Sequence, residues 1–135
     1  MRRLCLDHLS LYDITAIELI EIAAEVGCDA VSMFITPAPL GPYLDLTTDQ
    51  KAKSEVLSAL RDTGLSVGIV EPFMLEEHTD WNLLERSAAL AAELGGTVNA
   101  LCFDKEIARL EASFGRLAEI CGSEGARMAV EGFTL

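Results

Sequence analysis

The stretch Thr15–Ile35, TAIELIEIAAEVGCDAVSMFI, decides the fold class because a helix pattern passes into a strand pattern across one glycine. Its first four residues have the T-x-x-E spacing of a capping box, which predicts a helix over about Thr15–Val26. Gly27 is placed to end that helix in a left-handed conformation. The apolar run at roughly Ala30–Ile35 then predicts a strand.

The same helix–glycine–strand unit recurs along the chain at intervals of about 30 residues, the size of a βα unit. The further helices are predicted at about Asp49–Thr63, Trp81–Leu94 and Ile107–Ser123, and the strands at Leu4–Asp7, Leu65–Val70, Val98–Phe103 and from Arg127 to Val130. For the starts of these helices we expect a capping box at Thr47 and Gln50, an N-cap at Asp80 and an N-cap at Asp104. The chain therefore predicts five strands alternating with four helices.

Two α/β architectures fit this order: the first half of an eight-stranded barrel, and a complete five-stranded doubly wound sheet. A doubly wound sheet usually needs a final helix, and none is predicted after the last strand. The glycine-containing turns, Gly41-Pro42-Tyr43 and Gly95-Gly96-Thr97, match no phosphate-binding fingerprint. We therefore expect a partial (β/α)8 TIM barrel, formed by residues 1–135 as one domain that stops after its fifth strand.

Composition limits the classes of partner. The formal net charge of −12 argues against nucleic acid, because phosphates are bound by clustered lysine and arginine, and it is compatible with a divalent cation. No apolar stretch reaches the roughly 18 residues that span a bilayer. The four cysteines form no C-x-x-C pair and no zinc-binding spacing, which favours a reducing, cytoplasmic setting.

Acidic residues follow the apolar runs. Asp7, Glu71, Asp104 and Glu131 each come at the end of a predicted strand. In parallel α/β folds the carboxyl ends of the strands meet at one rim, where the chemistry of these folds is found. The sequence thus predicts a site on that rim, built in part from carboxylates.

Four short segments carry a resemblance to a known family. They are Leu6-Asp7-His8-Leu9-Ser10-Leu11, Ala24-Glu25-Val26-Gly27-Cys28-Asp29, Val70-Glu71-Pro72-Phe73 and Val130-Glu131-Gly132-Phe133. In this order they resemble the sugar phosphate isomerase/epimerase group, the xylose isomerase-like TIM barrels. The resemblance covers the whole chain and the first five strands of that barrel.

The resemblance implies a function for Glu131. It matches the family glutamate that binds a divalent metal and, in the ketose epimerase branch, moves a proton beside a carbonyl. A carboxylate is an oxygen ligand suited to Mg²⁺ or Mn²⁺. The family's other metal ligands come from strands six to eight, so we expect the isolated chain neither to hold the metal nor to be active.

Three further residues are candidates for binding a sugar or sugar phosphate. Glu71 is expected either to bind substrate hydroxyls or accept a proton, or to be structural. His8, after the first strand, either binds a substrate oxygen or is a satisfied structural histidine. Tyr43 lies in the long connection Thr36–Thr48, which is either a substrate lid or a rigid surface loop, and it could line the sugar pocket.

Three hypotheses about the whole protein follow. The chain is the N-terminal part of a metal-dependent sugar isomerase or epimerase, or a half-barrel that self-associates or pairs with a separate second half. The third hypothesis is a non-catalytic binding domain of the same fold. The first and last strands would be open edges, so we expect a homo-oligomer or a missing C-terminal half to cover them.

Overall fold

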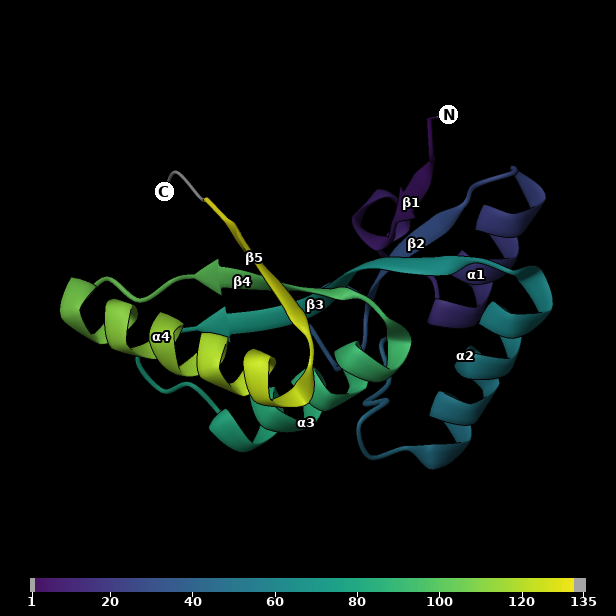
Figure 1. Ribbon diagram of the computed structural model, residues 1–135. Helices are drawn as coiled ribbons and strands as arrows, with labels where there is room; N and C mark the ends of the chain where they lie inside the picture. The colour runs from purple at the N-terminus through teal and green to yellow at the C-terminus, as the bar shows by residue number, and fades with distance from the viewer. Residues whose placement is uncertain (1, 133–135) are drawn as a thin grey trace.

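The computed structural model describes residues 2–132 as an alternation of strands and helices (Figure 1). The strands are β1 (Cys5–Asp7), β2 (Ala30–Phe34), β3 (Ser66–Leu75), β4 (Thr97–Cys102) and β5 (Arg127–Glu131). The helices are α1 (Ala16–Glu25), α2 (Gln50–Thr63), α3 (Trp81–Leu94) and α4 (Ile107–Glu124), with a short 3₁₀ helix at His8–Leu11. The predicted order of elements is confirmed.

All neighbouring strands are parallel, and they form one sheet in the order β1-β2-β3-β4-β5. A doubly wound sheet requires a point at which the strand order reverses. This sheet has no such point within residues 2–132, so the doubly wound alternative does not fit. The fold is α/β, with a parallel sheet whose strands follow the order of the chain.

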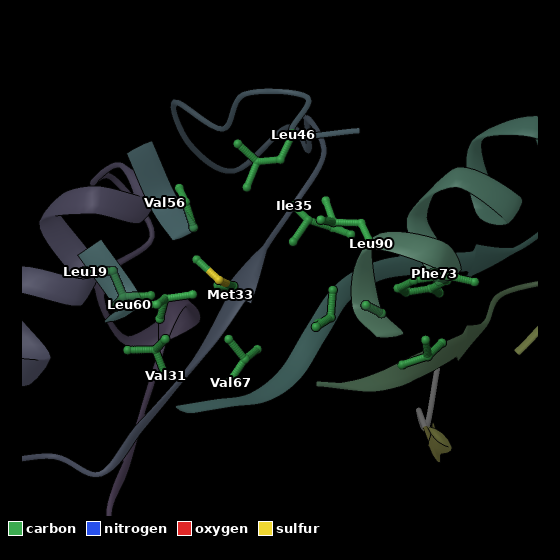
Figure 2. Close-up of a cluster of buried hydrophobic side chains, with 14 of the residues drawn as sticks. Leu19, Val31, Met33, Ile35, Leu46, Val56, Leu60, Val67, Phe73 and Leu90 are labelled. Carbon is green, nitrogen blue, oxygen red and sulfur yellow. The ribbon is translucent and has the colours of Figure 1, made fainter. Parts of the chain in front are cut away.

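The four helices lie on one side of the sheet, with α1 beside α2 and α3 beside α4 (Figure 1). Side chains from this side of the strands and from the helices form the hydrophobic core, in which Met33, Val67 and Phe73 are buried (Figure 2). Among the described residues no helix covers the opposite side, which we call the open face. It carries side chains of Asp7, Ile69, Glu71, Asn99, Ala129 and Glu131.

Local signals account for most helix boundaries. Thr15 and Glu18 form the predicted capping box, and Asp80 caps α3 as predicted. Two predicted caps are wrong. The side chain of Asp49 caps α2 while Thr47 bonds to Asp45, and Glu106 caps α4 in place of Asp104.

Strand β3 is longer than predicted. It continues past Val70 to Leu75, because Pro72 sits where the register with β4 shifts between Val70 and Phe73. Proline, which has no N–H to donate, is tolerated in a sheet at such irregular positions. Glu71 therefore lies within β3 rather than after its end, and its backbone oxygen accepts a hydrogen bond from Ile35.

The connection Thr36–Thr48 is fastened to the rest of the fold at several places. The Tyr43 hydroxyl donates to the backbone oxygen of Tyr12 at 2.6 Å, and Leu46 is buried in the core. A Cβ on Gly41 would lie 1.9 Å from the Tyr12 oxygen, so glycine is needed for this close approach. These contacts favour the rigid-loop alternative for this part of the connection.

Within residues 2–132, none of the helices combines the length and the apolar character needed to cross a bilayer.

Candidate functional site

Asn99 joins two carboxylates on the open face. Its side-chain nitrogen donates to Glu71 Oε1 at 2.9 Å and to Glu131 Oε2 at 2.7 Å. The three residues come from the neighbouring strands β3, β4 and β5. One amide group therefore fixes the spacing and orientation of two acids that are far apart in the sequence.

Glu71 and Glu131 differ in their surroundings. Glu71 is only 5% exposed, whereas Glu131 lies on an exposed strand. Burial raises the pKa of Glu71 above its ordinary value. The hydrogen bond from Asn99 opposes this rise in pKa, and the charges of Asp7 and Glu131 add to it. The pair thus combines a buried carboxyl group, whose pKa is raised, with a second carboxylate open to solvent.

The two acids line an open recess of about 550 Å³ on the open face. Asp7 and Ser10 lie at the side of the recess nearest β1, and Ile69 and Ala129 supply apolar surface. Asp7 also accepts a hydrogen bond from the backbone N–H of Leu9 at 2.8 Å, which fixes its carboxylate at the start of the 3₁₀ helix. The recess therefore combines several hydrogen-bond acceptors with space for a small molecule.

The described residues do not fit a complete metal site. Within residues 2–132 no group of three or more histidine, cysteine, aspartate or glutamate side chains is arranged to hold a metal ion. Glu71 and Glu131 offer two carboxylates, and both already accept a hydrogen bond from the same amide. Two such ligands leave most of the coordination of Mg²⁺ or Mn²⁺ to other groups.

His8 and Tyr43 lie together with Phe34 in a buried aromatic cluster. His8 is fully buried, its Nε2 lies 2.9 Å from the Ile14 oxygen, and its Nδ1 accepts from the Phe34 N–H at 3.4 Å. Tyr43 stacks on Phe34 at a centroid distance of 4.5 Å and meets His8 edge-on at 4.7 Å. Neither lines the recess beside Glu71 and Glu131. These contacts favour the structural alternative for His8 and place Tyr43 in the same packed cluster.

Asp104 also has a structural role. Its carboxylate forms an ion pair with Arg109, including a bond from Nη2 at 2.8 Å, and accepts the backbone N–H of Glu106 at 2.9 Å. This ion pair tethers the β4–α4 connection to the first turns of α4. Asp104 therefore stabilises this connection, whereas Glu71 and Glu131 meet at Asn99, although all three follow the same strand-end pattern.

Asn99 is the residue that the sequence analysis missed. A signal was present, because Asn99 interrupts an apolar run and a polar side chain within a buried strand must find a hydrogen-bond partner. The strand pattern alone could not show that its partners would be two glutamates on the neighbouring strands.

Comparisons with known proteins give the fold and no family. No protein-family model matches the chain, and the search of curated proteins finds no match. Among solved structures, the chain is similar to an uncharacterised protein from Parabacteroides distasonis, with a TM-score of 0.69 and 13% sequence identity. The match covers 97% of this chain and 53% of that one, so the chain spans about half the length of that structure. At this identity the similarity shows a shared α/β fold alone.

Proposed function

We propose that the chain forms the first five strands of a (β/α)8 barrel and provides part of a sugar isomerase or epimerase site. The observation that carries the proposal is the pair Glu71 and Glu131, held together by Asn99 on the open face. In such barrels the active site lies at the carboxyl ends of the strands. Glu131 is the last residue of β5, at that end of the sheet.

The sequential strand order and the single helix layer support the barrel part of the proposal. A closed barrel also needs a covered inner face and no free edges. Here β1 and β5 each pair with one strand, and Val130 on β5 is 56% exposed. A C-terminal half or a second copy of the chain is the partner that would cover these surfaces.

The chemistry assigned to the described residues is proton transfer beside a carbonyl. The exposed carboxylate of Glu131 takes a proton from the carbon next to the carbonyl. Glu71 Oε1, held 2.9 Å from the Asn99 side-chain nitrogen, accepts a hydrogen bond from a hydroxyl group of the substrate and so orients the carbon beside the carbonyl. Asn99 acts as a positioning residue for both acids. A divalent metal is assigned no step, because the described residues do not complete a site for one.

The first test is substrate contact. A ¹⁵N-labelled sample is titrated with fructose, and the amide resonances of Glu71, Asn99 and Glu131 are followed by NMR. We expect saturable shifts that cluster at these residues and are lost in Glu131→Gln. Glu119→Gln, which removes the same charge from an exposed position on α4, serves as the matched control. Shifts that are unchanged by Glu131→Gln, or no shifts at all, would refute the proposed site.

A non-catalytic binding domain is the second candidate, because the recess beside Glu71 and Glu131 offers hydrogen-bond acceptors and space for a small molecule without requiring a catalytic step. Hydrogen exchange of the sugar in D₂O distinguishes the two candidate functions. Proton transfer exchanges the hydrogen beside the sugar carbonyl for deuterium, and Glu131→Gln should slow this exchange by about 10²- to 10⁴-fold. Binding without exchange, in the protein together with its completing half, would favour the binding domain.

A further inference from the structure

A second recess adjoins the carboxylate pair. It has a volume of about 340 Å³ and lies between the connection after β2 and the ends of β3 and β4. Glu71 and Glu131 line both this recess and the larger one on the open face. The two acids therefore lie between the larger recess on the open face and this second recess.

The second recess is mainly apolar. Its walls include Leu9, Pro39, Leu40, Met74, Leu101 and Phe103. Leu9 and Leu40 are each about half exposed, at 48% and 49%, so the recess presents apolar surface to solvent directly beside two acids. An apolar hollow with a few convergent polar groups, one of them with a shifted pKa, is the usual form of a small-molecule site.

The lining excludes a phosphate from this part of the site. None of the described residues that line either recess is a lysine or an arginine. A phosphate placed here would face Asp7, Glu71 and Glu131 without a compensating cation, in a chain whose net charge is −12. Like charges at close range disfavour such binding.

We infer that the substrate presents a neutral, apolar end to this recess, such as the terminal methyl group of a deoxy sugar, while its hydroxycarbonyl carbons lie at the carboxylate pair. This inference rests on the proposed function and narrows its substrate class, from sugars and sugar phosphates to uncharged hydroxycarbonyl compounds with an apolar terminus. The volume of about 340 Å³ lies within the range for ligand pockets, so the recess has room for an apolar terminal group of the substrate.

The test compares two sugars that differ at one group. L-Fucose carries a methyl group where L-galactose carries a hydroxymethyl group, and L-galactose 6-phosphate adds a charge. Burying a hydroxyl group without a hydrogen-bond partner is unfavourable, so we expect L-fucose to bind about tenfold more tightly than L-galactose in NMR titrations. Equal or tighter binding of L-galactose or of the phosphate would overturn the inference.

Two variants test whether the apolar recess causes the preference for L-fucose. Leu40→Ser makes its wall polar and should bring the ratio of the two affinities close to one. Leu44→Ser, at an exposed leucine of the same connection that lines neither recess beside the acids, should leave the ratio unchanged. A preference that survives Leu40→Ser would overturn the inference.

A third probe separates failure of this inference from failure of the proposed function. Benzyl alcohol can enter the apolar recess without a carbonyl chemistry of its own, and it should shift the amide resonances of Leu40, Met74 and Leu101. If it does and no sugar binds, the proposed function fails while the recess remains a site for apolar groups. If benzyl alcohol causes no shifts there, for example because a second copy of the chain covers the recess, the inference is overturned.

Discussion

Replacing Asn99 with alanine tests the link between the two carboxylates through its effect on stability. Asn99 and Glu71 are 6% and 5% exposed, and a hydrogen bond to a charged group contributes about 1.5–3 kcal/mol. The second bond reaches the exposed Glu131, where solvent competes, so we count about 0.5–1 kcal/mol for it. Asn99→Ala should therefore lower the free energy of unfolding by about 2–4 kcal/mol at neutral pH.

The assay is urea unfolding followed by circular dichroism, with the fluorescence of the single tryptophan, Trp81, as a second probe. A lower midpoint with an unchanged m value reports a change in stability alone. Asn82→Ala, at an exposed position on α3, is the matched control and should change stability by no more than about 0.5 kcal/mol.

A double-mutant cycle identifies the partner of Asn99. In a Glu71→Gln background the residue at position 71 is uncharged, so Asn99→Ala should cost about 1–2 kcal/mol less than in the wild type. A loss below about 1 kcal/mol for Asn99→Ala, or an equal loss in both backgrounds, would refute the reasoning.

Three further predictions concern other parts of the molecule. Gly41→Ala should lower the free energy of unfolding in urea by about 1–3 kcal/mol, because its Cβ would meet the Tyr12 oxygen at 1.9 Å. Gly122→Ala, at an exposed position of α4 with no atom near the added Cβ, should not destabilise the protein. Burial lowers the pKa of His8 from its ordinary 6.5, so the unfolded state takes up a proton at a higher pH than the folded state does. The melting temperature should therefore fall as the pH drops below about 6.5. A melting temperature that stays constant between pH 6.5 and the lowered pKa would contradict this. Calorimetry with Mn²⁺ should give no tight binding to the isolated chain, and stoichiometric tight binding lost in Glu131→Gln would contradict our account of the ligands.

The fold was largely predictable because its signals are local. Helix α3 occupies the predicted Trp81–Leu94, since Asp80 caps its start and Gly95 ends it in a left-handed conformation. Strand β3 was predicted too short because Pro72 normally interrupts a strand, and the register shift that accommodates it depends on β4. The two wrong caps have a similar cause, since several acidic or hydroxyl side chains near a helix start compete for the same backbone N–H groups.

The candidate site was predictable only in part. The strand-end pattern selected Glu71 and Glu131, and the structure brings them together. Asp104 follows the same pattern and was predicted to cap α4, but its partner is Arg109, which the shape of the β4–α4 connection places beside it. His8 and Tyr43 have the right chemistry for a sugar site, but the 3₁₀ helix and the long connection direct them into the aromatic cluster.

The paired acids Glu71 and Glu131 are the centre of the proposed site, and a ¹³C NMR titration of the glutamate side-chain carboxyl groups measures their pKa values directly. We predict that Glu71 titrates above the ordinary range for glutamate, because burial raises its pKa, and that Asn99→Ala raises this pKa further by removing a hydrogen bond to the ionised form. A Glu71 pKa at or below the ordinary value, unchanged by Asn99→Ala, would contradict the account.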